Sequence, residues 1–279
     1  MAVSTTGQEW NLTDKQFAQI SELVHRLAGI NLHDGKRQLV KARLSRRMRV
    51  LSLTRFNDYL DHLESDTSGA ELTSMLDAIS TNLTYFFRES HHFHYLQETL
   101  LPTLEKQKTD RKIRIWSAGC SSGEEPYTLS VMLHETIKDL ARWDAAILAT
   151  DLSTKVLAIA RRGEYGPERF RESPEWVRRK YFQKQRTGSG DVYVPNPEVR
   201  RLITFARLNL MESWPMKGPF DFIFCRNVMI YFDKATQEQL VNRYWELLPP
   251  GGLLFLGHSE SLTGVNHKFR YVQPAIYRK

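Results

Sequence analysis

Residues 113–129 read I-R-I-W-S-A-G-C-S-S-G-E-E-P-Y-T-L, and they decide the fold. A short apolar run typical of a β-strand leads into a run of small residues, and an apolar pattern with helical period follows. A strand, a tight loop and a helix in this order bring backbone N–H groups close to a ligand, and the helix N-terminus adds partial positive charge. The stretch therefore predicts a nucleotide-like ligand at the end of a strand.

Two features of this loop argue against a dinucleotide. Gly119 and Gly123 lack the spacing of the three-glycine dinucleotide motif. Glu124 and Glu125 at the helix start would repel a pyrophosphate, whereas they can accept hydrogen bonds from hydroxyl or ammonium groups. A ligand with ribose hydroxyls and a positive centre fits better, and S-adenosylmethionine is one. The alternative is an ordinary tight turn in a structural α/β sheet.

Composition bounds the class of protein. The 279 residues suit one large or two modest domains, and 41% hydrophobic with 25% charged residues is ordinary for a globular chain. No apolar run could span a membrane and no secretory signal opens the chain, so we predict no membrane insertion. The two cysteines make no disulfide framework, which predicts a reducing cytoplasm. We predict no metal site, because Cys120 and Cys225 form no ligand set and His91, His92 and His94 lack ligand spacing.

Residues 1–80 are predicted to form a small all-helical domain. Thr13 and Gln16 form a capping-box pattern, and apolar residues then recur at helical spacing as far as Gly29. The stretch 36–49 holds seven basic residues and no acid, so the usual i,i+4 ion pairs are missing. We interpret it as a face for an acidic partner, which could be nucleic acid, an anionic membrane or a protein. A solvated helix face is the alternative. Its arginines are Arg43, Arg46, Arg47 and Arg49.

Residues 81–110 are predicted to be a connector and linker helix. Polar Asn82, Thr84 and Arg88 lie among aromatic residues in T-N-L-T-Y-F-F-R-E. Polar side chains on such a connector can cover a ligand bound in the next domain. Across residues 111–279, strands and helices then alternate as in a doubly wound parallel sheet.

Polar residues follow several predicted strands of that sheet. An aspartate stands directly after the strand 145–150, where such folds place the acid that binds both ribose hydroxyls. A helix N-cap is a second, compatible role for it. Ligands bind at the carboxyl edge of a parallel sheet. The candidates at strand ends are Asp151, Asn209, Leu210, Arg226 and Asn227.

Residues 181–206 interrupt the alternation of strands and helices. Period-2 runs around Gly188, Ser189 and Gly190 predict a small antiparallel insertion. A purely decorative hairpin and an edge that docks a partner peptide by strand addition are both open.

Taken together, these motifs carry a family resemblance. The loop above, F-D-F-I-F-C-R-N-V-M-I-Y-F and L-L-P-P-G-G-L-L-F-L-G-H-S-E resemble the class I S-adenosylmethionine-dependent methyltransferases. With T-N-L-T-Y-F-F-R-E and a basic helical domain in front, the chain closely resembles the bacterial chemotaxis receptor glutamate O-methyltransferases, the CheR family, from about residue 12. The implied fold is a Rossmann-like α/β methyltransferase domain with a small antiparallel β insertion, preceded by a small all-helical domain.

The resemblance also implies a reaction and its residues. A methyl group would pass from S-adenosyl-L-methionine to glutamates on the cytoplasmic helical domain of chemoreceptors, giving methyl esters and S-adenosyl-L-homocysteine at membrane receptor arrays. Arg88 and Tyr231 match residues that flank the reacting groups. The loop Gly188, Ser189 and Gly190 resembles that of members tethered to a receptor C-terminal pentapeptide. The implied cofactor contacts are Asn82, Thr84, Arg88, Glu125, Asp151, Asn209, Leu210, Arg226 and Asn227; the implied receptor contacts are Arg43, Arg46, Arg47 and Arg49.

A nucleic-acid methyltransferase with a basic N-terminal domain is the competing enzyme class. Against it, the exit of the fourth strand reads C-R-N-V-M-I-Y and lacks the D/N-P-P-Y/F motif of amine methylation. Cys225 is not preceded by proline, and no interleaving of aromatic and basic residues indicates a base-stacking surface. We therefore predict no nucleic-acid partner. A non-catalytic cofactor-binding adaptor is the remaining alternative.

Overall fold

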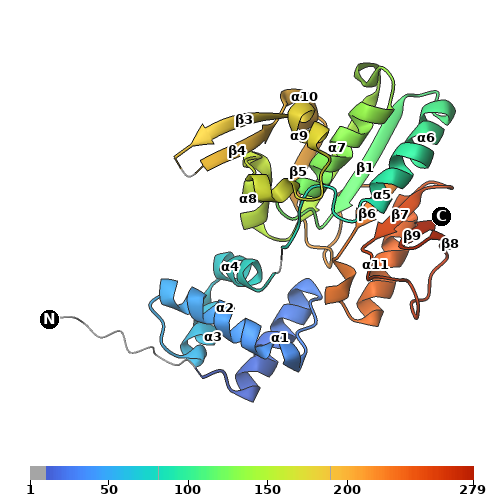
Figure 1. Cartoon of the computed structure of the whole chain (residues 1–279). Coiled ribbons are helices and arrows are strands. Elements are labelled where there is room, and N and C mark those ends of the chain that lie inside the picture. Colours follow the sequence, from blue (N-terminus) through green and yellow to red (C-terminus); the bar gives the residue numbers. More distant parts are fainter. Residues whose placement is uncertain (1–10, 81, 189) are drawn as a thin grey trace. The chain divides into compact units, whose positions relative to one another are not determined.

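The computed structural model describes residues 11–80, 82–188 and 190–279 (Figure 1). Ser189 of the predicted tether loop lies outside the described residues. The chain divides into two compact units, Met1–Thr81 and Asn82–Lys279. Within the described ranges, no helix combines the length and apolar character needed to cross a bilayer.

The first unit is helical, as predicted. Its helices are α1 (Asp14–Ala28), η1 (Asp34–Lys36), α2 (Arg37–Val50), α3 (Phe56–Ser65) and α4 (Ala70–Ile79). The capping box begins α1, since Thr13 and Gln16 exchange backbone and side-chain hydrogen bonds, and Gly29 ends it with φ 70°. Val40, Leu44 and Met48 recur at helical spacing along the basic helix α2, and all three are buried in the core of this unit.

The second unit is built on a seven-stranded sheet with the order β5-β2-β1-β6-β7-β9-β8. Five strands run parallel, and β9 pairs antiparallel with both β7 and β8. This confirms the Rossmann-like α/β fold. The strands are β1 (Lys112–Ala118), β2 (Asp144–Asp151), β5 (Ile203–Arg207), β6 (Phe222–Cys225), β7 (Leu253–Leu256), β8 (Arg270–Gln273) and β9 (Ile276–Arg278).

Helices cover both faces of this sheet, because alternate strand residues enter different cores. Ile115 and Phe224 pack in the cluster with residues of α7, whereas Trp116 and Ile223 pack with residues of α11. The helical elements are α5 (His91–Tyr95), a π-helical turn η2 (Leu96–Leu100), α6 (Leu101–Gln107), α7 (Glu124–Thr136), η3 (Leu140–Arg142), α8 (Thr154–Arg162), η4 (Pro167–Phe170), α9 (Glu175–Tyr181), α10 (Pro197–Arg200), η5 (Met229–Tyr231) and α11 (Lys234–Leu247).

A separate antiparallel hairpin confirms the predicted β insertion. It pairs β3 (Phe182–Thr187) with β4 (Gly190–Pro195) and projects from the main sheet in Figure 1. The predicted range 181–206 was too long, however, because β5 belongs to the main sheet, where it pairs parallel with β2. Since β5 is a half-buried edge strand, its alternating pattern resembles that of a hairpin strand.

One strand was missed in the sequence. β8 reads R-Y-V-Q, is short and lies at the sheet edge, so it carries little apolar signal. It joins the predicted final strand through a turn in which Ala275 has φ 61°.

Candidate active site

The carboxyl ends of β1, β2, β6 and β7 meet at one edge of the sheet. Ala118 at the end of β1 pairs with Thr150 of β2, and Cys225 at the end of β6 pairs with Leu256 of β7. Four of the predicted cofactor residues lie at or just after the ends of these strands: Glu125, Asp151, Arg226 and Asn227. This edge is therefore the candidate active site.

The loop after β1 is held tightly by its glycines. Gly119 has φ 88°, and a Cβ added there would lie 2.3 Å from Val228 Cγ2. Only glycine adopts this backbone without strain and also lets the loop contact the segment after β6. The Gly119 and Cys120 N–H groups both donate to the Thr150 carbonyl at 2.8 Å, which ties the loop to β2.

Asp151 ends β2 and fixes the same loop. Its Oδ2 accepts a hydrogen bond from the Ser121 N–H at 2.8 Å, and its Oδ1 accepts one from the Ser153 N–H at 2.9 Å. The N-cap of α8 is Ser153, whose hydroxyl accepts from the Val156 N–H, so the capping role considered for Asp151 is wrong. The carboxylate stands where doubly wound folds bind ribose hydroxyls.

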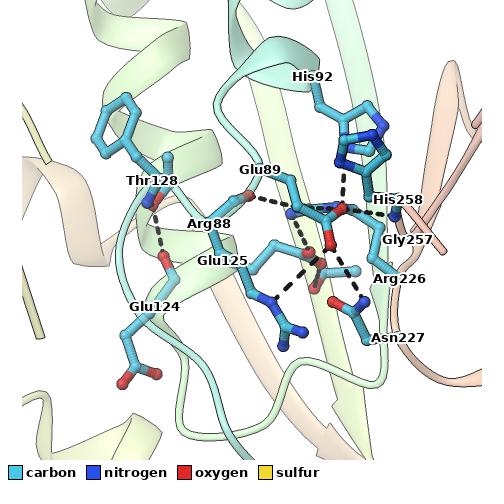
Figure 2. A network of polar contacts seen from close by, with 12 residues as sticks. Arg88, Glu89, His92, Glu124, Glu125, Thr128, Arg226, Asn227, Gly257 and His258 are labelled. Atoms are coloured by element: carbon cyan, nitrogen blue, oxygen red, sulfur yellow. Dashed lines mark hydrogen bonds and ion pairs between the residues drawn. The ribbon is translucent and has the colours of Figure 1, made fainter. Parts of the chain in front are cut away.

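Arg226, directly after β6, is the centre of a buried ion-pair network (Figure 2). Its side chain is 2% exposed and lies between two acids: Nη1 donates to Glu125 Oε2 and Nη2 to Glu89 Oε2, both at 3.0 Å. Nη2 also donates to the Arg88 carbonyl. Glu125 receives a further bond from the Ser117 hydroxyl at 2.7 Å. One guanidinium thus joins the connector, the first loop and the exit of β6.

Glu89, which sequence analysis did not select, faces Arg226 from the connector. Its Oε1 accepts from Asn227 Nδ2 at 3.2 Å, and its Oε2 accepts from the His258 N–H at 2.9 Å (Figure 2). Its only sequence signal is its place directly after Arg88.

A second missed acid, Glu260, joins the exits of β6 and β7. Its carboxylate accepts the N–H groups of Asn227 at 2.8 Å, Ile230 at 3.1 Å and Gly257 at 2.5 Å. These bonds hold Asn227 at φ 57°, a conformation that a non-glycine residue keeps only when its surroundings fix it.

Glu124, the residue before Glu125, anchors the start of the connector near Thr84. Glu124 is fully buried and accepts from the Ser122 hydroxyl at 2.7 Å and from Arg169 Nη1 at 3.0 Å. The same Arg169 nitrogen donates to the Thr84 carbonyl at 3.1 Å, and the Phe86 N–H donates to the Arg169 carbonyl. Consecutive acids therefore each hold an arginine, and each arginine holds a connector carbonyl.

Burial and ion pairing oppose each other at these acids. Burial alone would raise the pKa of Glu89, but Arg226 and the hydrogen bonds from Asn227 and His258 outweigh it and lower the pKa. Burial raises the pKa of Glu125 against the opposing effect of Arg226, and it raises the pKa of Glu124 despite Ser122 and Arg169. The site can therefore hold one ionised acid firmly beside others that protonate more easily.

The remaining predicted residues of this unit lie on the same connector or at neighbouring strand ends. The Asn82 carbonyl accepts from the Ser121 hydroxyl at 3.1 Å, which ties the start of the connector to the loop. Arg88 Nη1 donates to the Leu83 carbonyl at 2.6 Å. After β5, Asn209 Nδ2 donates to Glu212 at 3.1 Å and the Leu210 carbonyl accepts from Arg243. Tyr231 lies in η5, after Asn227.

The basic helix of the first unit differs from expectation. Arg47 forms a two-pronged ion pair with Glu71 of α4, a side chain 4% exposed that also accepts from the Tyr59 hydroxyl. Arg43 donates to the Ile79 and Ser80 carbonyls at the end of α4. The absence of acids from 36–49 did not reveal this ion pair, because the acid partner of Arg47 comes from another helix. Arg46 and Arg49 are exposed.

A buried histidine adjoins the network. His92 is fully buried, its Nδ1 lies 3.8 Å from Glu89 Oε2, and neither ring nitrogen has a hydrogen bond among the described residues. Burial, reinforced by repulsion from Arg226, lowers the pKa of His92 from 6.5 to about 2. The folded protein therefore keeps His92 neutral where the unfolded chain protonates it.

This predicts a loss of stability in mild acid. Because the unfolded state binds the extra proton below its pKa, the unfolding free energy falls as pH decreases, by about 1.4 kcal/mol between roughly pH 7.5 and roughly pH 5.5. Urea unfolding at both pH values should show a smaller loss, by that amount, for His92→Gln than for the wild type. His94→Gln at an exposed position should behave as the wild type. Equal losses in all three proteins would contradict a buried neutral His92.

The chemistry of this edge suits S-adenosylmethionine. The glycine loop after β1 packs closely against the segment after β6. Asp151 ends β2 at the position where such folds bind ribose hydroxyls. The buried Nε of Arg226 has no hydrogen-bond partner among the described residues, so the site has a spare donor. Glu125 and Asn227 add further polar groups at the same edge.

Comparison with known proteins supports S-adenosylmethionine as the cofactor. Residues 82–277 match the family model "CheR methyltransferase, SAM binding domain", and residues 15–80 match "CheR methyltransferase, all-alpha domain". A chemotaxis protein methyltransferase of Borreliella burgdorferi is 40% identical over 96% of this chain and 95% of its own length. Chemotaxis protein methyltransferase 2 of Pseudomonas aeruginosa is 41% identical, covering 97% and 95% of the two chains. The enzyme of Escherichia coli is 40% identical, covering 95% and 91%. The two family matches together span almost all described residues, and the chain belongs to the CheR methyltransferase family.

Proposed function

We propose that this protein transfers the methyl group of S-adenosylmethionine to glutamate side chains of chemoreceptors, giving glutamyl methyl esters. The observation that carries the proposal is the closure of the connector onto the carboxyl edge of the sheet by the Glu89, Arg226 and Glu125 network. The bond from Arg226 to the Arg88 carbonyl in this network supports the proposal that Arg88 serves the same site. The family match supplies the reaction class.

The reaction needs few catalytic groups. When bound, S-adenosylmethionine supplies a methyl group on a sulfonium, which a carboxylate oxygen can take without any proton transfer. A glutamate is already ionised at neutral pH, so no general base is required. The protein has to align the groups and exclude water, and such positioning can supply roughly 7–11 kcal/mol.

Each proposed residue has a part in that positioning. Asp151 would bind the ribose hydroxyls, and Glu125 with Arg226 and Asn227 would surround the amino-acid end of the cofactor. Asn82 and Thr84 would cover it from the connector, and Asn209 and Leu210 would border the adenine from the exit of β5. Arg88 would keep the substrate carboxylate ionised as water leaves, because an adjacent guanidinium opposes the rise in pKa on burial. Tyr231 would orient the acceptor.

The function is tested by the bond that the protein makes. Purified protein is incubated with methyl-labelled cofactor and either receptor-containing membranes or RNA, and the labelled product is treated with alkali. We expect label on the receptor that alkali releases as methanol, since esters hydrolyse and methylated bases do not. Alkali-stable label on RNA would instead indicate a nucleic-acid methyltransferase. Cofactor binding without transfer to either would favour the adaptor.

The helical unit is proposed to recognise the acidic helices of the receptor. Arg46 and Arg49 are exposed on α2, whereas Arg43 and Arg47 are half-buried and contact α4. We expect Arg46→Glu with Arg49→Glu to raise the KM for receptor several-fold at low salt without changing cofactor affinity, because exposed charges act mainly on association. Arg26→Glu, exposed on α1, is the control. Weakened cofactor binding in the double variant would argue against a receptor face.

The hairpin is proposed to tether a receptor C-terminal pentapeptide, and arrays of membrane receptors are the proposed location. Its turn contains Gly188 and Gly190, and the cross-strand ion pair of Lys184 with Asp191, 2.7 Å long, fixes the strands behind it. Titration with such a pentapeptide should show saturable binding that Lys184→Glu weakens. Absence of binding would indicate a protein that works without the tether.

A further inference from the structure

One carboxylate on the connector joins three parts of the candidate active site. Glu89 accepts hydrogen bonds from the Arg226 guanidinium, the Asn227 amide and the His258 N–H, which belong to the exits of β6 and β7 (Figure 2). Its side chain is 13% exposed. Such convergence on one acid fixes the position of each donor relative to the connector.

The backbone around Glu89 requires this fixing. Phe87 and Glu89 both have left-handed backbones, with φ 60° and φ 59°. Non-glycine residues persist in that region only where their surroundings hold them. The Phe87 N–H donates to the Thr128 hydroxyl at 3.3 Å, and its ring is buried. The Glu89 carboxylate holds the other side of the turn.

Arg88 lies between these two held residues. Its carbonyl accepts from Arg226, and its Nε lies 4.0 Å from Glu89 Oε1. Moving the Glu89 carboxylate would therefore displace Arg88 directly and also through Arg226. We propose that Glu89 is a positioning residue, which orients Arg88, Arg226 and Asn227 for cofactor and substrate without touching either. This inference rests on the proposed function.

The charge of Glu89 is part of that role. Arg226 stands between Glu89 and Glu125, so a neutral residue at 89 leaves the guanidinium attracted to Glu125 alone. Arg226 Nη2, which donates to the Arg88 carbonyl, would then lose its ion pair with Glu89 Oε2. Arg226 also lowers the pKa of Glu89, so the acid stays ionised at neutral pH and the effect of neutralising it should not vary from about pH 6.5 to about pH 8.

The test measures the affinity for S-adenosylhomocysteine by calorimetry at a temperature where circular dichroism shows each variant folded. We expect Glu89→Gln to raise the Kd about tenfold or more and to lower kcat as well, in proportion to the loss of one hydrogen bond between charged groups. Glu135→Gln is the matched control. Glu135 is 20% exposed and accepts from Lys180 and Tyr181 away from this edge, so its Kd should stay within about twofold of the wild type.

A double-mutant cycle separates positioning from a general loss of stability. If Glu89 acts through Asn227, then Glu89→Gln combined with Asn227→Ala should weaken binding no more than about the larger single change. Additive effects, or a lower melting temperature with an unchanged Kd, would show a merely structural role and overturn the inference. Glu89→Asp covers the case in which Glu89→Gln does not fold: a wild-type Kd there would likewise overturn it, and a rise of about threefold would support it.

The two proposals fail in different ways. If the wild type does not bind S-adenosylhomocysteine, the proposed function fails. If the wild type binds it and the Glu89 variants bind equally well, only the positioning role of Glu89 fails.

Discussion

Arg226→Met is expected to lower the unfolding free energy by about 3–5 kcal/mol, because it removes one partner from a buried ion-pair network. Glu89 and Glu125 would remain 13% exposed with no guanidinium between them. At roughly 2–4 °C per kcal/mol for a unit of this size, the melting temperature should fall by about 10 °C. Urea unfolding measures the first quantity and calorimetry the second.

The pH dependence of this variant identifies the cause. Without the guanidinium, the two facing carboxylates should have pKa values above those of the unfolded chain, so the folded state binds more protons. Lowering the pH from about 7.5 to about 6 should therefore reduce the difference in unfolding free energy between this variant and the wild type. Arg179→Met removes an exposed pair with Glu175, with side chains 75% and 61% exposed, and should change little. An Arg226 variant as mild as this control would refute a buried network.

Arg88→Ala is expected to show the opposite profile, with little loss of stability and a fall in kcat of about 10²–10³, because the desolvated substrate carboxylate would lose the guanidinium that keeps it ionised and aligned. Its side chain is 26% exposed, its hydrogen bond goes to the nearby Leu83 carbonyl, and its Nε lies 4.0 Å from Glu89. Little of the fold depends on the guanidinium, so a large kinetic effect would report on the reaction itself.

Arg88→Lys serves as the control for charge. It keeps the positive charge but not the planar fork of donors, so it should recover only part of the rate. Initial rates with receptor membranes give kcat and KM, and calorimetry gives cofactor affinity. If the Arg88→Ala protein had the wild-type rate and cofactor affinity, Arg88 would have no role in catalysis or cofactor binding.

The fold could be predicted from the sequence because its signals are local. The strand, small-residue loop and helix at 113–129 predicted β1, its loop and α7, and the capping box predicted the start of α1. Edge elements were harder, since β5 and β8 are partly exposed and carry weak apolar patterns. The hairpin range was therefore too long, and β8 was missed.

The contacts of the site depend on distant partners, which a single sequence does not pair. Glu89 and Arg226 are far apart in the chain, as are Arg169 and Thr84, yet each pair is joined in the fold. Arg47 and Glu71 are likewise distant in the sequence, and their ion pair links the basic helix α2 to α4. Motif resemblance selected Arg226 and Asn227 from their place at a strand end. It also selected Glu125, but it gave no reason to select Glu89 or Glu260, the other acids that hold these two residues.

The pairing of consecutive loop acids with two arginines has a practical consequence for truncation. Glu124 through Arg169 and Glu125 through Arg226 both grip the connector, which the contact pattern assigns to the unit Asn82–Lys279. A fragment that begins at residue 111, just before β1, would lack the Thr84 and Arg88 carbonyls to which these two arginines donate. It would also lack Glu89. A recombinant catalytic half should therefore begin at Asn82, so that it contains both the connector and the sheet to which the connector is bonded.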